Sequence, residues 1–235
     1  MARRRRGGRG PRPGGPRSGS PATPGTELAI PAGEERGAPL AGRVARIERK
    51  TRETEVLLQL RVDGTGETAA SSMWSRKGMV VWAAGKHGFL DLKVDARGDT
   101  EVDLHHTVED VGICLGKAFH EALGDKRGIV RFGTAHVPMD ETLAAAHVDI
   151  CGRPYFSYNV PLAKARIGNF DLDLLKDFFR AFAMNAMVNL HLNLHYGENV
   201  HHIAEAVFKA FGRALAEASR LDPRVGGVPS TKGAL

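Results

Sequence analysis

A five-residue motif occurs twice in this chain of 235 residues, and this repetition constrains the fold more than any other feature. The first copy is His105-His106-Thr107-Val108-Glu109 and the second is His201-His202-Ile203-Ala204-Glu205. Each copy opens a segment with apolar residues at helical spacing, and each follows a stretch with strand character. The copies lie 96 residues apart, close to half of the region with globular composition. We therefore expect an internally duplicated unit of mixed α and β structure.

The side chains of each copy are suited to metal binding. Residues three or four apart on a helix share a face, so each glutamate can approach the histidines that precede it. Nitrogen and oxygen donors without thiolates suit manganese, iron or zinc. Adjacent histidines cannot easily reach one ion from a helix, but they can contribute to two different ions. Surface or capping histidines are the alternative, and the repeated spacing argues against it.

The hydrophobic pattern predicts strands and helices that alternate from about residue 43 onward. Strands are expected at 52–62, 89–94, 128–137, 144–158 and 188–195, and helices at 107–123, 171–184 and 202–218. Gly124 is a candidate C-cap for the first of these helices. His191 and His195 occupy alternate positions of the last strand, which is also typical of ordinary sheet residues.

The basic character of the chain comes from its N-terminal segment. The formal net charge is +6, but residues 1–20 contain seven arginines and no acidic residue, and without them 26 basic residues face 27 acidic ones. Residues 1–38 are rich in Gly, Pro and Arg, so we expect them to be disordered. Three explanations of this segment remain open. It is a solvated tail, the product of a start site assigned too early, or an arm that binds RNA or DNA phosphates weakly.

The composition also bears on the cellular compartment in which the protein is expected. The chain has two cysteines, Cys114 and Cys151, which are too few for a disulfide scaffold. No apolar run reaches the length of a membrane span, and no signal peptide opens the sequence. We expect a cytoplasmic protein without a membrane partner.

Several polar motifs are suited to phosphate binding. Arg131 and Arg153 lie beside glycine or proline, and residues 227–233 read Gly-Val-Pro-Ser-Thr-Lys-Gly. Separated arginines and a terminal Ser/Thr/Lys cluster can hold a phosphate through charge-assisted hydrogen bonds. Each motif taken alone is more typical of a solvated loop.

Together these motifs resemble those of imidazoleglycerol-phosphate dehydratase, an enzyme of histidine biosynthesis. The resemblance rests on HHTVED at 105–110, LGDKRGI at 123–129, RFG at 131–133, VPMD at 137–140, DICGRPY at 149–155, LH at 190–191, YGENVHH at 196–202, EAVFKAF at 205–211 and GVPSTKG at 227–233. It extends from about residue 43 to the C-terminus.

The resemblance implies an α+β, two-layer fold, in which each half of a duplicated unit is a four-stranded sheet with helices on one face. Residues 1–38 would be a tail, 39–126 the first half, and 127–235 the second half with a C-terminal phosphate-binding segment. The family forms a shell of 24 subunits, with two manganese ions per active site at subunit interfaces. The implied reaction is a hydro-lyase step on a small phosphorylated imidazole, which gives a 2-oxopropyl phosphate and water.

The resemblance also assigns roles by position. The implied metal ligands are His105, His106, Glu109, His201, His202, Glu205 and Asp177, the last standing where some members have histidine. The implied catalytic residues are Glu53, His87, Asp140 and Lys209. The implied phosphate-binding residues are Arg131, Arg153, Ser230 and Lys232.

Residues 67–86 depart from the family pattern without a change in length. Met79 stands where the family has a ligand histidine, Gly78 where it has aspartate and Ala83 where it has glutamine. A thioether is a poor ligand for Mn²⁺, so we expect this metal site to be weakened. A locally shifted reading frame would explain the pattern; divergence or decay of a paralogue are the alternatives. The competing function is an impaired family member that only assembles or binds metal.

Overall fold

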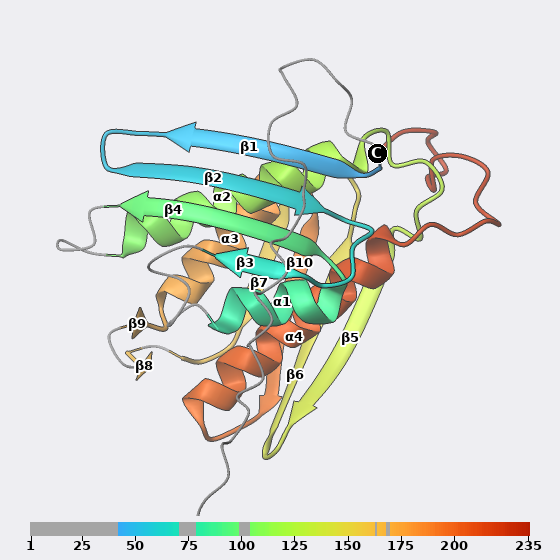
Figure 1. Cartoon of the computed structure of the whole chain (residues 1–235). Coiled ribbons are helices and arrows are strands. Elements are labelled where there is room, and N and C mark those ends of the chain that lie inside the picture. Colours follow the sequence, from blue (N-terminus) through green and yellow to red (C-terminus); the bar gives the residue numbers. More distant parts are fainter. Residues whose placement is uncertain (1–41, 71–78, 99–103, 163, 168–169) are drawn as a thin grey trace, which may run out of the picture. The chain divides into compact units, whose positions relative to one another are not determined.

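Two four-stranded sheets with the same strand order organise the described part of the chain (Figure 1). The computed structural model describes residues 42–70, 79–98, 104–162, 164–167 and 170–235. The segment predicted to be disordered, 1–38, lies outside these residues.

The elements of the first half are β1 (Val44–Lys50), β2 (Thr54–Arg61), β3 (Thr68–Ala70), α1 (Met79–Gly88), β4 (Asp91–Gly98) and α2 (His105–Leu123). The corresponding elements of the second half are β5 (Phe132–Met139), β6 (Thr142–Asp149), β7 (Tyr155–Asn159), α3 (Leu174–Ala186), β10 (Asn189–Tyr196) and α4 (Val200–Ser219). A small hairpin of β8 (Arg166–Ile167) and β9 (Phe170–Asp171) precedes α3.

The sheets have the orders β1-β2-β4-β3 and β5-β6-β10-β7. In each sheet the first three strands pair antiparallel and the fourth pairs parallel with its neighbour. Each half therefore repeats one sequence of elements: a hairpin, a third strand, a helix, a fourth strand and a long helix. The predicted α+β fold and the predicted duplication are confirmed.

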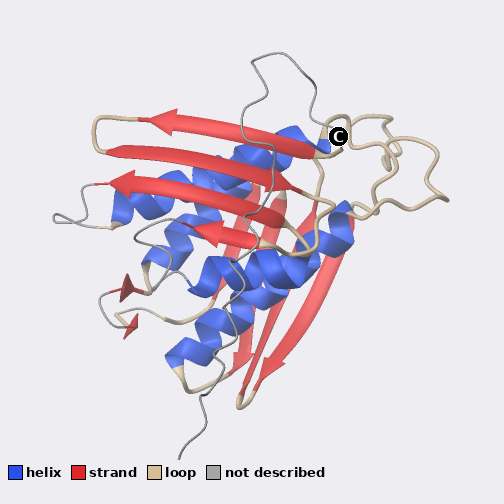
Figure 2. Ribbon diagram, viewed as in Figure 1, coloured by secondary structure: helices blue, strands red, loops and turns tan. Residues whose placement is uncertain are grey.

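Alternating burial explains why each sheet has helices on one face. In β2, Val56, Leu58 and Leu60 are buried at alternate positions, as expected for a strand with one covered side. The covering helix α2 buries Val111, Leu115 and related residues on one stripe. In the second half, α4 covers β5, β6 and β10 in the same way (Figure 2).

The helices also join the two halves. Helix α3 of the second half packs on α2 of the first, and α1 of the first half packs on α4 of the second. Two equivalent glycines permit close contact. A Cβ atom at Gly116 would lie 2.6 Å from the carbonyl oxygen of Phe182, and one at Gly212 would lie 2.3 Å from that of Ala84. A side chain at either position would collide with the backbone of the facing helix. Glycine therefore allows the two helix backbones to touch directly.

The predicted helices agree with the structure, and so do the predicted strands that correspond to β2, β4, β5 and β10, whereas β1 and the hairpin of β8 and β9 were not predicted. The expected strand over 144–158 is two strands, β6 and β7, separated by a turn at 150–154. The departing segment, which gave no prediction, contributes β3 and α1. Gly124 ends α2 with a positive φ of 55°, as its proposed role as C-cap requires. No helix in the described ranges is long and apolar enough to cross a membrane.

Candidate active site

The first histidine pair lies at the start of α2 among carboxylates from three elements. His105 Nε2 is 4.0 Å from Glu109 Oε2, and His105 Nδ1 is 3.4 Å from Asp177 Oδ2 in α3. His106 Nδ1 is 2.7 Å from Glu53 Oε2, which belongs to the turn between β1 and β2. The two imidazole rings are inclined by 80°. The adjacent histidines therefore serve different partners. We call these five residues the first cluster.

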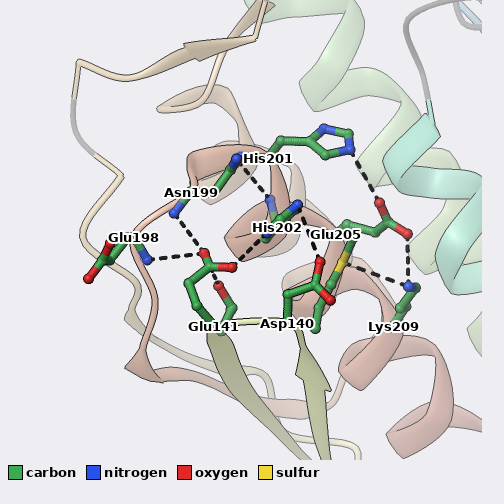
Figure 3. Close-up of polar contacts among 10 residues, drawn as sticks. Asp140, Glu141, Glu198, Asn199, His201, His202, Glu205 and Lys209 are labelled. Carbon is green, nitrogen blue, oxygen red and sulfur yellow. Dashed lines mark hydrogen bonds and ion pairs between the residues drawn. The ribbon is translucent and has the colours of Figure 1, made fainter.

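The second histidine pair has a matching arrangement at the start of α4 (Figure 3). His201 Nε2 is 3.4 Å from Glu205 Oε2, four residues along the helix. His202 Nδ1 is 2.7 Å from Glu141 Oε2, and His202 Nε2 is 3.8 Å from Asp140 Oδ2. Glu205 also holds Lys209 Nζ at 2.8 Å. The second cluster consists of these six residues: Asp140, Glu141, His201, His202, Glu205 and Lys209.

Local structure places the second cluster. Asn199 caps α4, because its side-chain oxygen accepts the N–H groups of His201 and His202 at 2.9 and 3.4 Å. The helix therefore begins where the histidines stand. The two-residue turn between β5 and β6 supplies Asp140 and Glu141, and Asp140 adopts the positive φ of 48° that tight hairpin turns use.

Hydrogen bonds and nearby charges change the acidity of this cluster. The pKa of Glu141 lies well below its ordinary value, because its carboxylate accepts hydrogen bonds from His202 and from the backbone of Asn199. The same hydrogen bond raises the pKa of His202. The pKa of His87 is lowered, first by burial and then by the positive charge of Lys209. His87, in the last turn of α1, thus lies close enough to the second cluster for the charge of Lys209 to affect it.

The residues predicted to bind phosphate lie around the C-terminal segment. The Arg131 guanidinium donates to Asp149 at 2.7 Å and to the Pro229 carbonyl at 3.0 Å. Ser230 follows Pro229, and its hydroxyl accepts the Lys232 N–H at 3.2 Å. A Cβ atom at Gly152, beside Arg153, would lie 2.5 Å from the backbone of Leu235. The chain terminus therefore passes next to both arginines.

The residues predicted to bind phosphate and the second cluster do not meet within one chain. Arg131 immediately precedes β5 and Asp140 immediately follows it. Nine residue steps along an extended strand span roughly 30 Å. A small substrate cannot contact both ends of β5 in the same subunit.

The donor types of both clusters fit manganese, since imidazole nitrogens and carboxylate oxygens are ligands that this ion accepts. One chain, however, does not bring enough of these donor atoms together at one point. Within the described residues, no three His, Cys, Asp or Glu side chains converge closely enough to hold an ion. Met79 is the first residue of α1, and its side chain lies outside the described part of the structure.

The sequence prediction missed Glu141. The residue directly follows Asp140, which the family pattern did indicate, and the second hairpin turn could have been compared with the first, which contains Glu53. His191, by contrast, lies on the face of the second sheet away from the helices, where its ring contacts Tyr155. His195 lies on the same face and stacks on His136. Both residues are outside the two clusters.

Comparison with known proteins identifies the family of this chain. The family model for imidazoleglycerol-phosphate dehydratase matches residues 79–215. The imidazoleglycerol-phosphate dehydratase of Trichlorobacter lovleyi is 56% identical over 193 residues, which are 82% of this chain and 99% of the relative. The crystal structure of the Staphylococcus aureus dehydratase is similar with a TM-score of 0.68 and 37% identity, over 76% of this chain and 99% of that one. The crystal structure of the Pyrococcus furiosus dehydratase, in complex with (S)-C348, is similar with a TM-score of 0.68 and 32% identity, over 80% of this chain and 100% of that one. This chain therefore belongs to the imidazoleglycerol-phosphate dehydratase family, the hydro-lyases of histidine biosynthesis.

Proposed function

We propose that the protein converts D-erythro-1-(imidazol-4-yl)glycerol 3-phosphate to 3-(imidazol-4-yl)-2-oxopropyl phosphate and water, with two manganese ions in each active site. Membership of the family supports the reaction class. One observation carries the specific proposal: both long helices begin with two histidines that contact carboxylates in the same pattern. Two equivalent donor groups are what a two-metal site requires.

The metal ligands of this proposal are the donors of the two clusters. They are His105, His106, Glu109 and Asp177 in the first, and His201, His202 and Glu205 in the second. Because the donors of one chain do not gather in threes within the described residues, the shells would be completed by a second copy. When bound, manganese supplies Lewis acidity that stabilises negative charge on the substrate's imidazole ring.

Four further side chains are assigned to proton transfer and charge stabilisation. Glu53 and Asp140 present carboxylates on hairpin turns, where they can accept the proton removed from carbon. Lys209 presents an ammonium group that can donate to the departing hydroxyl. His87 has a lowered pKa, so its imidazole is neutral at pH 7 and can accept or relay a proton.

The separation along β5 supports an active site shared between copies. Arg131, Arg153, Ser230 and Lys232 of one copy would bind the phosphate, while the clusters of another would bind the imidazole end. We extend this proposal to the family's shell of 24 subunits. A cytoplasmic location belongs to the same proposal, because both cysteines are free thiols, as a reducing compartment favours.

The decisive experiment is steady-state dehydration by the purified full chain with added Mn²⁺. A variant with residues 67–86 restored to the family pattern is measured beside it. Turnover by the native chain supports the proposal, and absence of turnover in both proteins contradicts it. Gel filtration after EDTA tests the shared site, because loss of the joining ions should release smaller species. An unchanged elution volume would contradict that part of the proposal.

A second candidate function is a family member that assembles and binds metal without turnover. Met79, at the position of the family's ligand histidine, is the observation that favours it. Turnover only in the restored variant would establish this alternative, since the scaffold would then be competent and the native segment would be the defect.

A further inference from the structure

Glu141 makes more contacts than its place in a surface turn suggests. One carboxylate oxygen, Oε2, lies 2.7 Å from His202 Nδ1. The other, Oε1, accepts the N–H groups of Asn199 at 2.8 Å and Glu198 at 3.3 Å, and the Thr142 hydroxyl at 3.0 Å (Figure 3). The carboxylate is therefore held from both sides, by the chain that enters α4 and by the second histidine of the motif.

The same contact exists in the first half of the molecule. Glu53 lies in the turn between β1 and β2, and its Oε2 is 2.7 Å from Nδ1 of His106. The hairpin of β1 and β2 occupies the position in its sheet that the hairpin of β5 and β6 occupies in the other. His106 and His202 are equivalent residues of the repeated motif. Glu141 is thus the structural counterpart of Glu53.

The two glutamates nevertheless differ in the exposure and the hydrogen bonding of their side chains. The Glu53 side chain is 60% exposed, whereas that of Glu141 is 35% exposed and accepts two backbone N–H groups. A mobile carboxylate is suited to move a proton, and a fixed one is suited to orient its neighbour. The two equivalent contacts therefore differ in how firmly the carboxylate is held.

We infer that Glu141 is a positioning residue that selects the nitrogen through which His202 binds metal. This inference rests on the proposed metal site. A carboxylate only accepts hydrogen bonds, so the contact requires the proton of neutral His202 to be on Nδ1. Nε2 then keeps its lone pair. It is also the atom nearer Asp140, inside the second cluster. Glu141 presents Nε2 of His202 as the ligand and fixes the ring relative to the start of α4.

The test is Glu141→Gln in the full chain. Glutamine keeps the size of the side chain and an oxygen that can accept the Asn199 N–H, but it places an amide NH₂ against His202 Nδ1. Nδ1 must then accept, so the proton moves to Nε2 and blocks metal binding. We expect Mn²⁺ affinity, measured by electron paramagnetic resonance of free Mn²⁺, to fall about 10- to 100-fold.

Two further variants separate positioning from charge and folding. Glu198→Gln removes the same charge from the neighbouring turn before α4 and leaves the N–H that donates to Glu141, so we expect unchanged Mn²⁺ affinity. Glu141→Asp keeps a carboxylate and should recover part of the lost affinity. Equal loss in Glu141→Gln and Glu198→Gln would overturn the inference, because net charge would then explain the effect.

A metal-free measurement keeps this inference distinct from the proposed function. Nitrogen-15 NMR reports the tautomer of His202, whose signal is identified by its loss in His202→Asn. We expect Nδ1–H in the native chain and Nε2–H in Glu141→Gln. Failure of the native chain to bind Mn²⁺ with this tautomer change present would refute the metal site and leave the positioning role standing. The same tautomer in both proteins would overturn the positioning role itself.

Discussion

Gly116 in α2 lies against the backbone carbonyl of Phe182 in α3, with 2.6 Å between the position of a Cβ atom and the oxygen. The neighbouring atom is main chain and cannot rotate away. Gly116→Ala should therefore separate the two helices. We expect a loss of about 1–3 kcal/mol in the free energy of unfolding, despite the better helix propensity of alanine.

Denaturant unfolding of metal-free protein measures this loss. Gly226→Ala is the matched control, because a Cβ atom at Gly226 would meet nothing within 4 Å. Equal stability of the two variants would show that α2 and α3 can move apart at no cost.

Met79→His should strengthen manganese binding. The substitution restores an imidazole at the position of the family's ligand, where a thioether binds Mn²⁺ poorly. We expect a rise of about tenfold or more in Mn²⁺ affinity, together with higher dehydratase activity. Val80→His adds the same imidazole one residue further along α1, where the family pattern has no ligand, and should change neither quantity. If both variants bind Mn²⁺ like the native chain, residue 79 contributes nothing to the metal site.

Acid should destabilise the second half through His147. The pKa of His147 is lowered from its ordinary value of 6.5, first by burial and then by the neighbouring His136, His191 and His195. Its ring also contacts Thr134 at 3.2 Å. Because the folded state disfavours the proton, this contribution to stability is present above pH 6.5 and is lost as the pH falls through the lowered pKa.

Denaturation midpoints of the metal-free chain at pH 7.5 and pH 5 test this expectation. His147→Gln cannot take up the proton, so the difference between its two midpoints should be smaller than in the native chain. An identical difference would show that other groups cause the acid sensitivity.

Cys114 should be inert in the folded protein. Burial raises the pKa of its thiol to about 11, and the side chain is fully covered by the core. At pH 8 only about one thiol in a thousand is ionised, and that fraction is shielded. In Cys151→Ser, a chromogenic disulfide reagent should detect no thiol in the native state and one after denaturation. Rapid reaction in the native state would mean that α2 opens readily.

Subunits with different defects should restore one another. Lys232→Ala impairs the phosphate end of a subunit, and Asp140→Asn impairs the cluster at the far end of β5. If each active site uses one end from each of two copies, random mixed assembly leaves about a quarter of the sites intact. We expect each variant alone to be inactive and a mixture, reassembled with Mn²⁺, to recover activity. No recovery would place both ends in one subunit's own site.

The parts of the fold that were predictable are those with a local signal. Helices α2 and α4 have long amphipathic stripes, and each begins at a repeated His-His pair. Helix α1 gave no such signal, because its segment departs from the family pattern and has no repeated His-His pair at its start. The packing of α3 on α2 depends on glycines whose neighbours are more than sixty residues away, so no local pattern indicates it.

The candidate site divides in the same way. The i,i+4 spacing indicated that His105 and Glu109, or His201 and Glu205, would approach each other. The contact of Glu141 with His202 joins a hairpin turn to a helix start across 61 residues. Such a contact follows from the strand pairing of the whole sheet, and a single acidic residue in a turn does not reveal it.

The exchange of helices between the halves shows what one half of this chain would need in order to fold alone. Each half places its shorter helix on the long helix of the other half. A chain of half this length would expose the faces of both helices to water unless it paired with an identical chain. The contact between the halves is therefore equivalent to the interface that two half-length copies would form with each other.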